Sequence, residues 1–133
     1  STWATAWAQS ALPIPCLGTT HADHLPAPVP CTEFMGDERV RGDYEAEIGR
    51  AIAELFGAVS PEEVPMALVA GHGPFTWGES PEKAVYAAAV LEEIAKTALL
   101  TLFLDPDRPP LPRALIERHF YRKHGPDAYY GQK

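Results

Sequence analysis

The segment that begins at residue 80 constrains the fold of this chain more than any other. Ser80 is a suitable N-cap, Pro81 fits the first helical position, and Glu82 complements the positive end of the helix dipole. The pattern predicts a helix that ends near Leu104. Its apolar residues cover a broad face: Val85, Ala88, Ala89, Leu91, Ala95, Ala98, Leu99 and Leu102. Such a helix packs against a sheet or a neighbouring subunit, so we expect a layered fold.

Composition narrows the class of protein. The chain has 133 residues, 46% of them apolar, which suits a single globular domain and excludes intrinsic disorder. No stretch approaches the roughly 20 apolar residues that span a bilayer, since Glu92, Glu93 and Lys96 interrupt the longest one. There is no signal-peptide pattern, and Cys16 and Cys31 form no CxxC motif. We therefore expect a cytoplasmic protein that does not act at a membrane and keeps its thiols reduced.

The charge balance is acidic. A net charge of −7, from 18 acidic and 11 basic residues, argues against nucleic acid as a partner. The one basic cluster lies near the C-terminal end, and a solvated helix face explains most of its members.

Two short strands joined by a tight turn are predicted around His72. Residues 64–70 are apolar, Gly71 and Gly73 flank the histidine, and an aromatic run ends at Trp77. Further helices are predicted over about residues 3–10, 43–56 and 113–124, whereas the prolines of residues 19–30 predict a loop. This order indicates one α/β or α+β layered domain over residues 1–133, with too few strands for a complete sheet.

His72 is the first candidate for chemistry. A histidine on a rigid turn, with glycines that leave space beside the ring, suits a metal ligand or a proton carrier. The alternative is an ordinary turn histidine. Residues 69–78 by themselves favour that alternative, because a lone histidine is poor evidence for a metal.

Residues 19–24 form a second candidate, with two histidines and a carboxylate between prolines. Asp23 could donate or accept a proton there, with Thr19 and His21 as hydrogen-bonding neighbours. The alternative is an Asx-type turn in which Asp23 caps nearby backbone amides.

The C-terminal region holds the third candidate. The hydroxyl of Tyr130 could act as a general acid beside a cation or metal, or the tail could only anchor itself by burying its aromatic rings. His119 and Arg122 lie one helical turn apart on one face, where they could approach an anionic substrate or pair with surface acids.

Seven motifs, spread over essentially the whole chain, are informative together. They are Ala4-Thr5-x-Trp7-Ala8-Gln9, Gly18-Thr19-Thr20-His21-Ala22-Asp23, Val29-Pro30-Cys31-Thr32, His72-Gly73-Pro74-Phe75-x-Trp77-Gly78, Val90-Leu91-Glu92-Glu93, Lys123-His124-Gly125 and Ala128-Tyr129-Tyr130-Gly131-Gln132. This set resembles the L-ribulose-5-phosphate 4-epimerases of the class II aldolase and epimerase superfamily. The histidine turn is shared with related sugar-phosphate aldolases, whereas the Asp23 and Tyr130 motifs are more specific to the epimerases.

The resemblance implies a three-layer α/β/α fold around a mostly antiparallel sheet, assembled as a homotetramer with active sites between neighbouring subunits. It implies a zinc or similar divalent ion and a retro-aldol route between L-ribulose 5-phosphate and D-xylulose 5-phosphate. By position, His72 matches a metal ligand, and Asp23 and Tyr130 match the acid/base pair. Residues assigned to substrate binding or support are Thr19, His119 and Arg122.

The chain departs from the family pattern in the residues that bind the metal and the substrate's phosphate. The family's His-x-His metal pair, an upstream acidic ligand and the phosphate-binding residues have no counterpart in residues 1–133. The resemblance therefore implies the C-terminal part of the family domain, with the remaining zinc ligands upstream of Ser1. We expect a complete parent to be catalytic and this chain alone to be inactive. The alternatives are a class II aldolase for another sugar phosphate and a non-catalytic oligomerisation or binding module.

Overall fold

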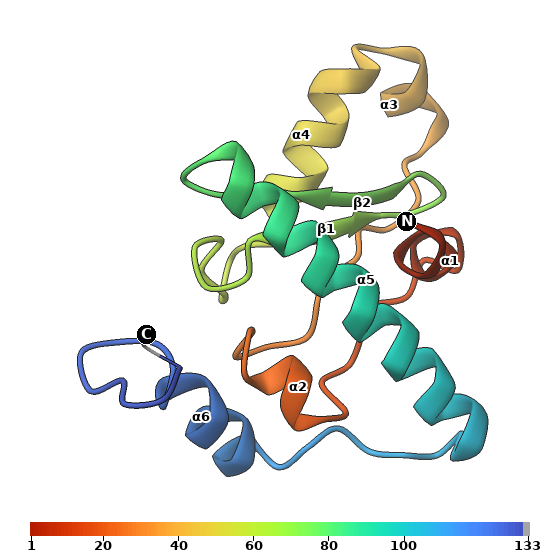
Figure 1. The fold of residues 1–133 in the computed structure, drawn as a ribbon. Helices are drawn as coiled ribbons and strands as arrows, with labels where there is room; N and C mark the ends of the chain where they lie inside the picture. The colour runs from red at the N-terminus through yellow and green to blue at the C-terminus, as the bar shows by residue number, and fades with distance from the viewer. Residues whose placement is uncertain (132–133) are drawn as a thin grey trace.

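The computed structural model describes residues 1–131, in which helices surround a small antiparallel sheet (Figure 1). The elements follow in the order α1 (Thr2–Gln9), α2 (Thr19–Ala22), α3 (Asp37–Arg41), α4 (Tyr44–Glu54), β1 (Met66–Val69), β2 (Gly73–Thr76), α5 (Pro81–Leu104) and α6 (Arg113–Tyr121). This mixture of helices and strands is compatible with the predicted α/β class. None of the helices in residues 1–131 combines the length and the apolar character that a membrane crossing requires.

The hairpin of β1 and β2 lies at the centre of the fold. The two strands are antiparallel, with Met66 opposite Thr76 and Val69 opposite Gly73. All four residues of β1 are buried, because helices α1 and α5 pack on the hairpin and Cys31 pairs with Leu68 at the other edge of β1. The turn that carries His72 therefore projects from a well-packed base.

Helix α5 begins where the sequence predicts. The Ser80 hydroxyl accepts a hydrogen bond from the Lys83 N–H, and Pro81 stands in the first turn. The buried residues of this helix are Ala87, Leu91, Ile94, Ala95 and Ala98. The broad predicted face was therefore wrong in part, since four of its members are exposed: Val85, Ala88, Ala89 and Leu99. The helix carries one apolar stripe in the core and a second at the surface.

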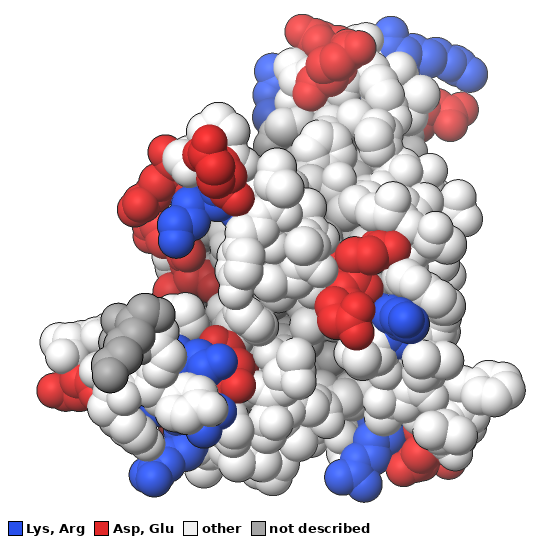
Figure 2. Space-filling view, in the orientation of Figure 1, with Lys and Arg blue, Asp and Glu red and all other residues white. Residues whose placement is uncertain are grey.

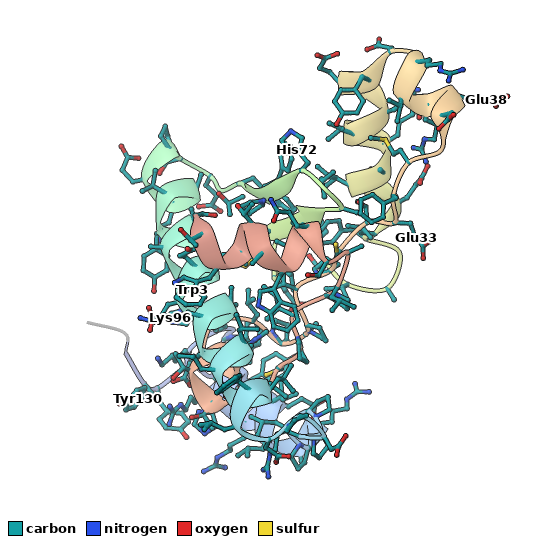
Figure 3. All side chains as sticks on the ribbon, turned by 90° about the vertical axis from the view of Figure 1, so that its right-hand side faces the viewer. Trp3, Glu33, Glu38, His72, Lys96 and Tyr130 are labelled. Carbon is teal, nitrogen blue, oxygen red and sulfur yellow. The ribbon has the colours of Figure 1, made fainter. Side chains whose placement is uncertain are left out.

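Helix α1 depends on α5 for its beginning. The Glu92 carboxylate accepts hydrogen bonds from the N–H groups of Trp3, at 2.8 Å, and Ala4, at 3.0 Å. These are N–H groups that a helix cannot satisfy by itself. The Trp7 indole N–H donates to the Ala95 carbonyl at 2.9 Å, and Lys96 lies over the Trp3 ring (Figure 3). The α1–α5 pair is thus joined by polar contacts as well as apolar packing.

Three sequence predictions need correction. Residues 19–30 are not a loop throughout, because residues 19–22 form the single turn of α2. Helix α3 was not predicted at all, and α6 ends at Tyr121 rather than near residue 124. The physical reason for the first error is that the prolines all follow α2, and a proline restricts only itself and the residue before it.

Candidate active site

The carboxylate of Asp23 contacts three basic side chains. His119 donates from Nδ1 to Oδ1 at 2.9 Å, and Arg122 donates to both carboxylate oxygens at 2.9 and 3.1 Å. The Lys123 Nζ lies 3.2 Å from Oδ2. We call these four residues, with His124, the Asp23 cluster. It joins α2 to the end of α6, which lie about a hundred positions apart along the chain.

The cluster holds Asp23 ionised. Burial of the Asp23 side chain, which is 16% exposed, would by itself raise the pKa of its carboxyl, but hydrogen bonds from His119, Arg122 and Lys123 more than offset this and lower the pKa below its usual value. Two basic side chains, Arg122 and Lys123, face one carboxylate, so the formal charge of the cluster at neutral pH is positive. Asp23 does not cap a backbone amide in any of these contacts, which differs from the Asx-turn alternative.

Tyr130 lies beside this cluster. The Arg122 guanidinium stacks over its ring at 4.4 Å from the centroid, and the Lys123 Nζ lies 5.5 Å from it. The N–H groups of Tyr129 and Tyr130 both donate to the Arg122 carbonyl at 2.9 Å, which folds the tail back on α6. Arg122 therefore contacts both members of the predicted acid/base pair. Gln132, the last residue of the C-terminal motif, lies outside the described residues.

Thr19 stands at the first position of α2, and its carbonyl accepts the Asp23 N–H at 2.8 Å. This bond places Asp23 directly after the helical turn, with its side chain toward α6. The backbone of Thr19 therefore takes part in building the cluster. Of the predicted site residues, the structure brings together Thr19, Asp23, His119, Arg122 and Tyr130.

His72 stands apart from this group. It is exposed on the hairpin turn, and its ring contacts Phe75 with 5.4 Å between centroids. Gly71 has a φ of +72°, and a Cβ there would come within 2.8 Å of the Phe34 ring, so the turn requires a glycine at that position. Figure 3 shows His72 at the hairpin turn, well separated from Tyr130 in the C-terminal tail.

A metal site is not complete within the described residues. Residues 1–131 contain no group of three or more His, Cys, Asp or Glu side chains placed to hold an ion. A catalytic zinc usually has three protein ligands, so the residues present do not fit such a centre by themselves.

A groove of about 860 Å³ opens next to the Asp23 cluster. Its walls include His24, Tyr86, Tyr121 and His124, and the Tyr86 hydroxyl lies 3.5 Å from His24 Nδ1. Lys and Arg gather over the α6 end of the molecule, whereas Asp and Glu gather over the beginning of α5 and the turn before it (Figure 2). The α6 side of the groove is thus its basic side, whereas Glu62, Glu63 and Glu79 line it from the other side.

Sequence reasoning missed the contacts of Lys123 and His124 with Asp23. His124 donates from Nε2 to the Asp23 carbonyl at 3.0 Å, and its ring stacks on Phe120. The available signal was the Lys123-His124-Gly125 motif, which carries no spacing rule that would connect it to residue 23.

The chain belongs to the family described as the Class II Aldolase and Adducin N-terminal domain, which it matches over residues 1–99. The curated relatives of the chain carry the name of a particular enzyme within this family. The chain is 48% identical over all 133 residues to the L-ribulose-5-phosphate 4-epimerase UlaF of Salmonella paratyphi C (strain RKS4594), and 47% identical to that of Salmonella typhi. It spans 58% of the length of each of these curated relatives.

Proposed function

We propose that this chain is part of a sugar-phosphate epimerase that interconverts L-ribulose 5-phosphate and D-xylulose 5-phosphate. The observation that carries the proposal is the 48% identity, over the whole chain, to enzymes named for this reaction. The Asp23 cluster supports it, because Arg122 contacts both Asp23 and Tyr130 and the cluster has a positive formal charge beside the groove. A phosphorylated sugar is the kind of anion that such a charge attracts.

The proposed chemistry inverts one carbon by breaking and re-forming the bond between C3 and C4. Inversion of this kind requires two proton carriers, one for each face of the aldehyde intermediate. We assign these roles to Asp23 and Tyr130. Because the cluster lowers the pKa of Asp23, this carboxylate is ionised at neutral pH and begins as the acceptor of the C4 hydroxyl proton. As the C3–C4 bond re-forms on the opposite face, the phenol of Tyr130 donates its proton to the aldehyde oxygen. Asp23 then releases its proton and Tyr130 regains one through solvent before the next turnover.

We further propose that His72 is one ligand of a divalent ion, zinc by analogy with the family, whose other ligands lie outside this chain. The exposure of His72 and the required glycine beside it support this role. The described residues alone do not complete the site. Purified as residues 1–133, the protein is expected to bind zinc weakly and to show no epimerisation, while a complete parent shows both. Stoichiometric zinc with turnover from the isolated chain would contradict this.

We also propose a homotetramer in which one subunit supplies His72 and its neighbour supplies Asp23 and Tyr130. The separation of His72 from Tyr130 within one chain supports this arrangement (Figure 3). The exposed stripe of α5 supplies an apolar surface for assembly, with Phe103 82% and Leu104 84% exposed. A surface of this kind is typical of subunit contacts.

Mixed assembly tests the shared site. His72→Asn and Tyr130→Phe variants of the complete protein are each expected to be inactive. When the two are coexpressed, about a quarter of the native activity should return, because random assembly pairs an intact His72 with a neighbour's intact Tyr130 at one interface in four. Activity is measured on the purified mixed oligomers. If no activity returns, the two residues serve one chain's own site and the shared-site proposal is wrong.

A second assay separates the epimerase from the alternatives. The complete protein is incubated with L-ribulose 5-phosphate and the products are separated. D-xylulose 5-phosphate as the main product supports the proposal, whereas net release of a two-carbon aldehyde would indicate an aldolase. Absence of any turnover from a correctly assembled, zinc-loaded oligomer would favour the non-catalytic module.

A further inference from the structure

The end of α6 is attached to the body of the molecule through α2. Residues 105–112 form the connection from α5, and α6 then packs against α2 (Figure 1). The α2–α6 contact therefore helps to place Tyr130 relative to Asp23. The side-chain bonds to the Asp23 carboxylate fix one end of that contact.

His124 fixes the other end. Its ring stacks on Phe120, one turn earlier, with 4.3 Å between centroids and 18° between planes. Phe120 is only 4% exposed, so the stack holds the imidazole against a buried support. From this position Nε2 lies 3.0 Å from the carbonyl oxygen of Asp23. A carbonyl can only accept, so Nε2 must carry a proton and donate.

The bond to the backbone of Asp23 differs in its effect from the bonds to its carboxylate. The bonds from Arg122 and Lys123 hold the carboxylate at the end of the side chain. A bond to the carbonyl instead sets the orientation of the peptide that carries the side chain. His124 also follows directly after Arg122 and Lys123, the two residues whose side chains contact the Tyr130 ring.

We infer that His124 is a positioning residue, which holds the α2 turn against the C-terminal tail so that Asp23 and Tyr130 keep a fixed separation. The inference rests on the proposed function, since it concerns the same two proton carriers. His124 itself does not exchange protons with the substrate in this scheme. The competing explanation is a helix-end contact that contributes only to stability.

Amide hydrogen exchange on residues 1–133 tests the positioning without any need for turnover. His124→Phe keeps the stack on Phe120 and removes the donor, whereas His124→Gln keeps a donor in the position of Nε2. Exchange at the Tyr129 and Tyr130 amides, which bond to the Arg122 carbonyl, should become at least about tenfold faster in the Phe variant and change by less than about threefold in the Gln variant. Arg118→Gln, an exposed change on the same helix, is the matched control. Unchanged exchange at both tyrosines in the Phe variant overturns the inference.

Kinetics on the complete protein give the second readout. His124→Phe should lower kcat at least about tenfold with KM changed by less than about twofold, and His124→Gln should recover most of the loss. Equal kcat for the Phe variant and the parent overturns the positioning role. If the unsubstituted protein has no epimerase activity, the proposed function fails, whereas unchanged exchange in the Phe variant would still overturn the inference.

Discussion

The hairpin turn and the Asp23 cluster position their candidate functional side chains in opposite ways. His72 is exposed, its ring contacts Phe75, and a backbone that requires Gly71 holds the turn. Asp23 is largely buried and has hydrogen bonds from His119, Arg122 and Lys123. The first region fixes the backbone and leaves the side chain available, while the second fixes the side chain itself.

The difference indicates which region can tolerate change. A side chain on a rigid turn can be replaced without loss of packing, because its neighbours do not depend on it. A carboxylate that neutralises two cations cannot, because its removal leaves like charges close together in a partly buried place. Stability should therefore depend on the Asp23 cluster, and metal content should depend on the turn.

Asp23→Ala is expected to have the largest effect. It leaves Arg122 and Lys123 without their shared counterion, and loss of one partner from a partly buried ion pair should lower the free energy of unfolding by about 2–4 kcal/mol. Chemical denaturation measures the change, with Asp127→Ala in the exposed tail as control. In the complete protein epimerisation should fall by about 10²–10⁴-fold with metal content unchanged. Loss of metal would mean that the role of Asp23 is misassigned.

Acid should weaken the same cluster. Because the pKa of Asp23 is lower in the folded state than in the unfolded chain, its contribution to stability is complete above its ordinary pKa of about 4 and is lost as the pH falls through the folded value. Unfolding free energies at several pH values between 6 and 2 measure the loss. The difference between the parent and Asp23→Asn should shrink in the acid part of this range. A difference that is constant with pH would contradict the charge-based explanation.

His72→Asn should have the smallest effect on the fold. Since the ring is exposed, the free energy of unfolding should change by no more than about 0.5 kcal/mol. In the full-length epimerase that we propose, with His72 as a metal ligand, the same change should remove most of the zinc, which elemental analysis measures. A destabilised hairpin in this variant would remove the proposed contrast between the two regions.

The sequence was sufficient to predict those elements whose structure depends on neighbouring residues alone. The beginning of α5 follows from Ser80 and Pro81, and the hairpin follows from the apolar run before Gly71. The buried face of α5 was only partly predicted, because alanines alone do not show which side meets α1. That choice depends on Trp7 and Glu92, which reach across between helices distant in sequence.

Residue patterns predicted less of the candidate site than of the fold. Asp23 is separated by 96 and 99 positions from the His119 and Arg122 side chains that bond to it. No periodicity or capping rule connects residues at that distance. The family resemblance assigned all three residues to one site but did not predict the bonds between them. The contacts of His124 were not anticipated because the carbonyl of Asp23 gives no signal in the sequence.

The bonds between Glu92 and the first turn of α1 affect the order in which the chain can fold. The two N–H groups lie 89 and 88 residues before their acceptor, and the Trp7 indole lies 88 residues before Ala95. On the ribosome, α1 is therefore made long before the groups that satisfy its polar atoms exist. An eight-residue helix is too short to be stable alone. Helix α1 should thus become ordered only after α5 has emerged, although it is synthesised earlier.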